Sequence, residues 1–126
     1  MRYGNNSNVA ITGIDETGGA LKGGVIEFDV DFGTDLISNG TMLIYDSSNT
    51  TWSVTFDGNV HGAFATMSNV TGTFGGTDTV TGAIGGAFTG TTTTPDFVSG
   101  FSLKSGSSFV QGMSLLDNEN CFTCTP

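Results

Sequence analysis

Glycine placement between residues 80 and 103 constrains the fold more than any other feature of this sequence. The segment VTGAIGGAFTGTTTTPDFVSGFSL carries five glycines among large apolar side chains. Glycine destabilises the interior of a helix by about 0.5–1 kcal/mol relative to alanine, which argues against a helix here. The apolar side chains argue equally against a flexible linker. We therefore predict extended strands in which Phe74, Phe88 and Phe101 fill the space over glycines of the adjacent strand. A glycine-lined ligand groove is the alternative.

Alternation of apolar and acidic residues predicts a strand over residues 25–32. This gives the strand one apolar face and one acidic face. The apolar positions are Ile26, Phe28, Val30 and Phe32, and the acidic positions are Glu27, Asp29 and Asp31. No window of about twelve residues shows the period of 3.6 that a helix requires, so the only helical element that we allow is a single turn at residues 36–39.

Turn residues recur about every 8–12 residues, a spacing typical of antiparallel sandwiches and barrels. We predict a turn at Ser38-Asn39-Gly40 and a hairpin turn at Asp57-Gly58-Asn59. The strand after that hairpin, residues 60–67, would carry Val60, Gly62, Phe64 and Thr66 in one register. The predicted fold is all-β: a small antiparallel up-and-down β-barrel of about eight strands, whose interior is filled by side chains.

Three parts of the chain are distinguished by their patterning. Residues 1–24 are predicted to form a loose N-terminal arm with one or two short strands. Residues 25–116 form the barrel, and residues 117–126 form a C-terminal tail with the sequence DNENCFTCTP.

The charge of the chain excludes several partners. The net charge is −9, and the lysines and arginines number only three. Such a surface repels nucleic acid and anionic membrane faces.

No apolar stretch reaches about 18 residues, so no transmembrane segment is expected. Outward strand positions that are acidic or hydroxylated also disfavour an outer-membrane barrel. A chain rich in Thr, Ser, Asn and Gly with little lysine favours an extracellular or cell-surface location. The chain begins with polar residues and shows no signal peptide, so an exported protein would be a mature piece or part of a longer chain.

Cys121 and Cys124 form a C-x-x-C motif near the C-terminus. A thioredoxin-type site needs a helix after the first cysteine, and haem attachment needs a histidine after the second, where Thr125 stands instead. Half of a zinc site is a further alternative. We favour a disulfide in an oxidising compartment, and the pattern leaves open whether it forms within one chain or between two chains.

Several segments resemble a known barrel domain. They are 52-WSVTFDGNVHG-62, 72-GTFGG-76, 81-TGAIGGAFTG-90, 98-VSGFSL-103 and 110-VQGMSLL-116. Together they resemble the C-terminal β-barrel domain of transferrin-binding-protein-like surface and periplasmic proteins of Gram-negative bacteria, which also occurs in exported proteins with FecR-type domains. The matching positions are Gly86, Phe88 and Gly90, then Gly100 and Phe101, then Gly112 and Met113.

The resemblance covers roughly residues 40–116. It implies an eight-stranded antiparallel barrel on an exported protein, extracellular, at the cell surface or periplasmic, of a Gram-negative bacterium. Residues 91–96, TTTTPD, depart from the small-residue-plus-acid segment of that family. The family's binding residues lie in variable loops and other domains, so none is carried over to this chain.

No catalytic constellation is present in the sequence, and we expect a protein that is not an enzyme. His61 is the only histidine, and no Gly-x-Ser-x-Gly elbow occurs. Glu27, Asp29 and Asp31 could supply the paired carboxylates of a glycosidase, but a solvated strand face explains them better. Asp29, Asp31 and Asp35 are instead our candidate ligands for a possible Ca²⁺ ion, although the spacing is not that of an EF-hand; no other cofactor is expected.

Two functions fit these observations. The first is a binding module that presents loops to a protein or a small ligand, with Asp46, Asn49, Asp78, Thr93 and Asp96 at the loop tips. The alternative is a structural subunit of an extracellular filament, sheath or surface layer, in which the terminal arms add strands to a neighbour and the cysteines lock the contact. The partner is accordingly another protein or a second copy of the chain.

Overall fold

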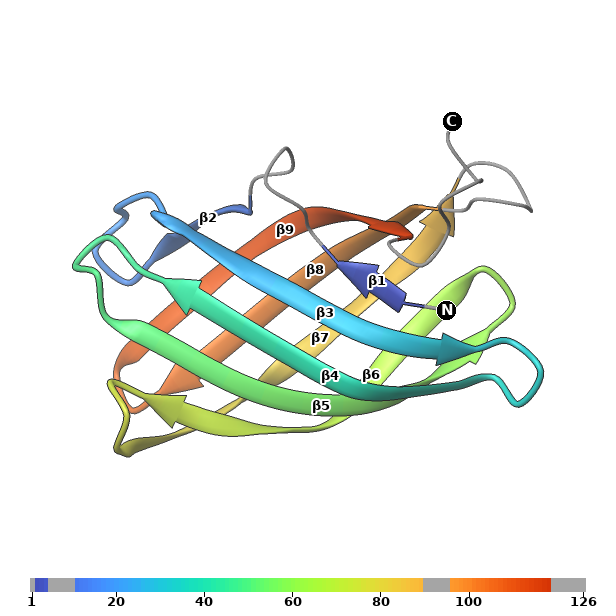
Figure 1. Ribbon diagram of the computed structural model, residues 1–126. Helices are drawn as coiled ribbons and strands as arrows, with labels where there is room; N and C mark the ends of the chain where they lie inside the picture. Colours follow the sequence, from blue (N-terminus) through green and yellow to red (C-terminus); the bar gives the residue numbers. More distant parts are fainter. Residues whose placement is uncertain (1, 5–10, 90–95, 119–126) are drawn as a thin grey trace.

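The computed structural model describes residues 2–4, 11–89 and 96–118, and in these residues it contains strands and turns but no helix (Figure 1). The strands are β1 (Arg2–Gly4), β2 (Thr12–Asp15), β3 (Gly23–Asp31), β4 (Leu36–Tyr45), β5 (Thr51–His61), β6 (Phe64–Phe74), β7 (Asp78–Thr89), β8 (Asp96–Ser105) and β9 (Ser108–Asn118). All of them belong to one sheet.

The sheet is an antiparallel meander that curls round on itself. Strands β3 to β9 pair in chain order, and β1 pairs with both β3 and β9, so that it joins the two ends of the sheet. The predicted all-β, up-and-down antiparallel fold is confirmed. Alternate connections lie at opposite ends of the sheet, as Figure 1 shows.

The eighth position of the barrel is occupied by two short strands from the N-terminal region. β2 pairs with β9 at Thr12↔Met113, and β1 pairs with β9 at Gly4↔Asp117. The two pairs lie eight residues apart on the N-terminal segment (12 − 4) but four apart on β9 (117 − 113). Strands β1 and β2 therefore lie along the same partner strand as two separate pieces.

The interior is filled by alternate side chains from each strand. Trp52, Phe28, Phe97, Ile44 and Leu103 are completely buried. Phe56 lies against Gly40, and Phe97 lies against Gly86, so a side chain at either glycine would collide with a ring. The packing of phenylalanine on glycine thus occurs, but these rings are not the predicted ones.

Of the predicted rings, Phe74 packs on Trp52 and Phe88 packs on Phe97. Most of the strand glycines instead approach the backbone of a neighbouring strand. A Cβ atom at Gly82 would lie 2.9 Å from the Cα atom of Leu103, and one at Gly72 would lie 2.7 Å from that of Val54. These glycines allow neighbouring strands to approach closely where the sheet coils.

Two predicted turns are wrong because β-bulges place turn-type residues within strands. β5 continues through Asp57-Gly58-Asn59 to His61, and the hairpin turn follows at Gly62, where φ is +65°. Consequently Val60 is buried while Phe64 is exposed, so the two do not share a face.

The second wrong turn lies in β4. This strand continues through Asn39 at a register shift against β5, and residues 36–39, where the sequence allowed a single helical turn, are also strand. Asn39 has φ +54° and Asn69, at another register shift, has φ +53°. Asparagine tolerates the left-handed conformation that a bulge can require, so it resembles a turn residue in the sequence.

Candidate functional site

The predicted loop residues lie at opposite ends of the barrel. Asp46 and Asn49 belong to the β4–β5 turn, and Asp78 begins β7 just after the β6–β7 turn, at the same end. The β7–β8 connection starts from the other end (Figure 1). Thr93 lies outside the described residues, and for Asp96 only the backbone is described. The three described side chains, those of Asp46, Asn49 and Asp78, therefore lie at the end opposite to the start of β8.

Asp46 is a buried acceptor that organises its own turn. Its Oδ1 accepts hydrogen bonds from the backbone N–H groups of Ser48 (3.0 Å) and Thr50 (2.9 Å). Its Oδ2 accepts a hydrogen bond from the indole Nε1–H of Trp52 (3.2 Å). The turn needs this support because Asn49 has φ +63°. Both carboxylate oxygens thus bond within the protein, which indicates a structural role.

Asp15 links two loops at the same end of the barrel. Its Oδ1 accepts hydrogen bonds from the backbone N–H (3.0 Å) and hydroxyl (2.6 Å) of Thr17. Its Oδ2 accepts hydrogen bonds from the backbone N–H of Ser47 (2.9 Å) and from the Ser47 hydroxyl. These bonds, first that of the Ser47 hydroxyl and then that of the Thr17 hydroxyl, hold the pKa of Asp15 well below its ordinary value despite the opposing effect of burial.

We call this end, with Asp15, Asp46, Trp52 and Phe74, the latched end. The Trp52 and Phe74 rings are 4.4 Å apart between centroids, and the Trp52 indole bonds to the Asp46 carboxylate. Sequence analysis did not identify Asp15. The available signal was the string Asp-x-Thr followed by two glycines, which is typical of a side-chain-capped turn.

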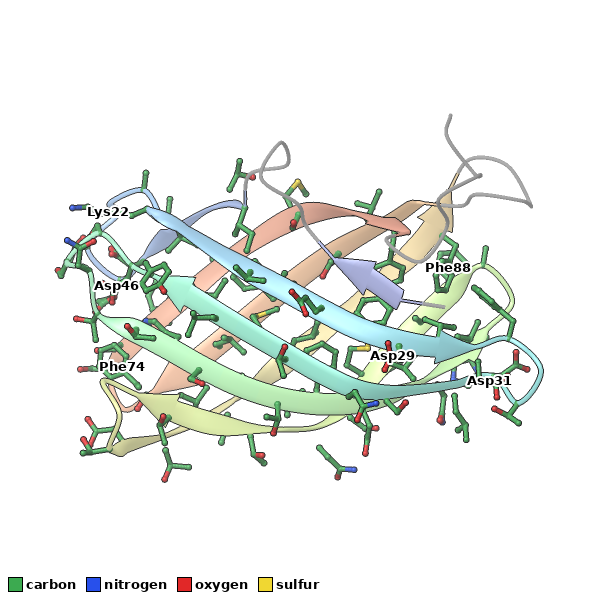
Figure 2. The ribbon with its side chains drawn as sticks, in the orientation of Figure 1. Lys22, Asp29, Asp31, Asp46, Phe74 and Phe88 are labelled. Carbon is green, nitrogen blue, oxygen red and sulfur yellow. The ribbon has the colours of Figure 1, made fainter. Side chains whose placement is uncertain are left out.

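The opposite end exposes large apolar side chains and is called here the aromatic end. It comprises the β3–β4 and β5–β6 turns with Phe32, Leu36, Phe64 and Phe88. The Asp35 carbonyl accepts a hydrogen bond from the Val60 N–H (2.9 Å), and the Ala63 carbonyl accepts one from the Phe88 N–H (2.7 Å). These bonds hold the two turns and the end of β7 together. Figure 2 shows Phe88 and Asp31 at this end and Asp46, Phe74 and Lys22 at the other.

Aromatic contacts run from the surface of the aromatic end into the core. Phe32, which is 42% exposed, packs edge-on against Phe88 with 5.2 Å between ring centroids. Phe88 packs on Phe97 at 4.8 Å, and Phe97 packs on the fully buried Phe28 at 5.2 Å. The surface ring is thereby fixed to the core, while Leu36 and Phe64, 51% and 66% exposed, extend the apolar surface across the two turns.

Charge differs between the two ends. Asp31 and Asp35 border Phe32 and Leu36 at the aromatic end, and His61 is exposed beside the β5–β6 turn. Of the side chains that the structure describes, both lysines, Lys22 and Lys104, belong to the latched half of the barrel. The aromatic end is therefore apolar at its centre and acidic at its border.

The predicted calcium ligands serve local backbone structure. Asp31 Oδ1 accepts hydrogen bonds from the N–H groups of Gly33 (2.8 Å) and Thr34 (3.3 Å), and Asp29 Oδ2 accepts one from Asn39 Nδ2 (2.9 Å). Asp35 has φ +57° in the turn. Within residues 2–4, 11–89 and 96–118, no three His, Cys, Asp or Glu residues are grouped so that they could hold a metal ion.

A second aspartate–asparagine pair lies on the outer wall. Asn69 Nδ2 donates to both carboxylate oxygens of Asp57 (3.1 and 3.0 Å), and Ser68 Oγ donates to Oδ1 (2.9 Å). These two side chains, Asn69 first, lower the pKa of Asp57. A shallow groove lies between this pair and Asn39, with Thr41, Thr55 and Thr71 in its lining. Each pair secures a left-handed asparagine at a bulge, so both pairs stabilise the wall.

Two further predictions concern parts of the chain beyond these sites. Cys121 and Cys124 lie outside the described residues, so their pairing stays a prediction. Across the described segments, no helix has the length and apolarity needed to cross a membrane.

Comparisons of the chain with models of protein families, with curated proteins and with solved structures found no match. The resemblance to the transferrin-binding-protein-like barrel domain therefore stays a prediction that rests on the motifs quoted above.

Proposed function

We propose that this chain is a non-enzymatic binding module of the cell exterior, which binds a protein partner through the aromatic end. One observation carries the proposal: Phe32, Leu36 and Phe64 are 42%, 51% and 66% exposed at adjacent turns. Clustered exposed apolar side chains with a polar border are typical of protein interaction sites. The contact of Phe32 with Phe88 also limits the entropy that this ring would lose on binding.

The chemistry of the site favours a partner whose binding surface has an apolar centre and a rim of lysine or arginine. Asp31 and Asp35 lie next to the exposed apolar residues, and the whole chain carries a charge of −9. Opposite charge on the partner would accelerate association and help to select it, and this contribution would weaken as salt is added.

Location outside the cell is supported by composition and by the family resemblance. Only 12% of residues are charged, about half of the roughly 25% found in average proteins, and the outer wall is rich in threonine and serine. Glycine-rich barrel segments that resemble exported Gram-negative proteins point in the same direction.

The test compares two double variants at opposite ends of the barrel. Leu36→Ser/Phe64→Ser removes apolar surface from the aromatic end. Val25→Ser/Tyr45→Ser is the matched control, because these residues are 40% and 38% exposed on β3 and β4 toward the latched end. Immobilised wild-type and variant chains are exposed to envelope and medium proteins of the organism that makes the chain, and each retained protein is purified and titrated calorimetrically.

The proposal expects a partner that binds the wild-type chain and the control pair with similar affinity but binds Leu36→Ser/Phe64→Ser at least about tenfold more weakly, a loss of about 1.4 kcal/mol. A partner that tolerates the aromatic-end pair and is lost with the control pair would contradict the proposal, as would the absence of any partner for the wild-type chain.

A structural subunit is the second candidate, favoured by the way in which β1 joins the sheet. β1 contributes only three residues, yet it pairs with both β3 and β9, and such a strand could be supplied by a neighbouring copy. Light scattering on the full chain, with and without reductant, distinguishes the two. A monomer of 12.9 kDa excludes this candidate, and a polymer supports it.

A further inference from the structure

Two serines face the interior of the barrel without a hydrogen-bond partner. Ser99 of β8 and Ser114 of β9 are 1% and 5% exposed, and neither hydroxyl bonds to any group of the described protein. The two residues are direct register partners across the β8–β9 pair. Gly86 of β7 is the register partner of Ser99, so the three form one row of small residues across three neighbouring strands.

An unpaired hydroxyl in a protein interior is costly. A buried donor or acceptor without a partner destabilises a fold by about 1–3 kcal/mol, and native proteins satisfy the large majority of such groups. Alanine at either position would avoid this cost. Two such hydroxyls opposite each other indicate that both are satisfied by one group that they share.

The position of the serines defines what that group can be. Directly opposed residues in an antiparallel pair have Cβ atoms about 4.5–5.5 Å apart, so a single small molecule between them can reach both hydroxyls. Each serine hydroxyl donates one hydrogen bond and accepts others, so the shared partner must be able to do both. Water has this capacity, and buried water commonly makes two to four hydrogen bonds to otherwise unpaired groups.

The packing around the row disfavours a larger guest. The Phe97 ring lies over Gly86. A Cβ atom added at Gly86 would be 2.5 Å from the Cζ atom of Phe97. The same ring packs on Phe88 at 4.8 Å and on Phe28 at 5.2 Å between centroids, so Phe97 is held in this position by two further rings. The space over Gly86 in this row is thus filled by the Phe97 ring.

We propose that Ser99 and Ser114 together bind one ordered water molecule inside the barrel. This site is independent of the partner surface at the aromatic end. Ser114 lies on β9 between Met113, which pairs with β2, and Asp117, which pairs with β1. The water therefore lies beside the part of β9 between the residue that pairs with β2 and the residue that pairs with β1.

The experiment counts long-lived internal waters by magnetic relaxation dispersion in three proteins. They are the wild type, Ser99→Ala/Ser114→Ala, and Ser102→Ala as a control. Ser102 lies on the same strand as Ser99 but is exposed. We expect the double variant to hold one internal water fewer than the wild type and the control to hold the same number. Equal counts in all three proteins overturn the proposal.

A crystal structure of the wild type provides a second measurement that does not depend on the variants' folding. Density for a single water within hydrogen-bonding distance of both Oγ atoms supports the site. Density that extends beyond one water, or two hydroxyls that bond only to each other or to the backbone, overturns it. Native mass spectrometry of the purified chain identifies any bound molecule larger than water, which would also overturn the assignment.

Discussion

The two ends of this barrel use their turn residues in opposite ways. At the latched end, Asp15 and Asp46 are buried, and all of their carboxylate oxygens accept hydrogen bonds from neighbouring backbone or side-chain groups. At the aromatic end, Leu36 and Phe64 are more than half exposed. An acidic residue in a turn suggests a ligand site in the sequence, but here Asp15 and Asp46 stabilise the fold, and the surface that we propose for a partner is apolar.

The two ends also differ in the contacts that close the interior of the barrel. Trp52 donates a hydrogen bond to Asp46 and packs on Phe74, so polar and apolar contacts close the latched end together. At the aromatic end, a series of ring contacts runs from Phe32 through Phe88 to Phe97, and backbone hydrogen bonds join the turns. Substitutions should therefore affect stability more at the first end and binding more at the second.

Replacement of Trp52 by alanine is expected to have the largest effect. Removal of a fully buried tryptophan costs about 3–5 kcal/mol of the free energy of unfolding, and it also removes the Nε1–H donor to Asp46. Phe32→Ala, at the exposed start of the aromatic series, should cost only about 0.5–1.5 kcal/mol. Urea unfolding measures the loss of stability in both variants, provided that their m-values equal that of the wild type. Equal losses would contradict the proposed difference between the ends.

A pair of glycine substitutions tests the packing of the wall between the ends. Gly86→Ala should destabilise the protein by about 1–3 kcal/mol, because its Cβ atom would meet the Phe97 ring and the Val98 carbonyl. Gly100→Ala meets only the Gly112 carbonyl oxygen at 4.0 Å, so it should be neutral or stabilise by up to about 1 kcal/mol. Equal destabilisation by the two changes would show that close packing is not the reason for glycine at residue 86.

Acid should weaken the latched end through Asp15. The pKa of Asp15 is lowered in the folded protein from an ordinary value of 3.8, so its contribution to stability is fully present above that value and is lost as the pH falls below it. Asp15→Asn should lower the melting temperature by several degrees at pH 7, and the deficit should shrink on acidification toward pH 2. Thermal unfolding followed across this range measures it. A deficit that stays constant with pH would contradict the carboxylate's role.

The smallest effect on stability is expected from Leu36→Ser and Phe64→Ser. Both side chains are exposed, and surface substitutions usually change the free energy of unfolding by no more than about 0.5 kcal/mol. The same changes are the ones expected to weaken partner binding. If either substitution lowered the free energy of unfolding in urea by about 2 kcal/mol or more, that side chain would belong to the core and could not be part of the proposed binding surface.

Local sequence pattern predicted the strands well where tertiary packing agrees with it. The alternation in β3 places Ile26, Phe28 and Val30 in the core, as expected from the period of two. The composition and turn spacing also led to the antiparallel barrel. These features depend on the residues within each strand and turn, so they can be predicted from one sequence.

The predictions failed where a residue's role depends on a neighbouring strand. Asn39 and Gly58 resemble turn residues, but Asn39 lies at a register shift of β4, and Gly58 follows a register shift of β5 and pairs regularly with both neighbouring strands. The shift of the hairpin to Gly62 then exposes Phe64, which is why the aromatic end was missed. The local string Asp-x-Thr could have marked Asp15 as a turn residue, but its link to Ser47 could not be predicted because Ser47 lies 32 residues away.

Chemical-shift mapping of the isotope-labelled chain, titrated with the partner identified through the paired variants, tests the central claim most directly. The account predicts that the largest changes occur at Phe32, Leu36 and Phe64 and that the amides of Ser47, Ser48 and Thr50, which donate to Asp15 and Asp46, change little. Large changes at Asn49, Asp78 and these latched-end amides, with the aromatic end unaffected, would contradict it.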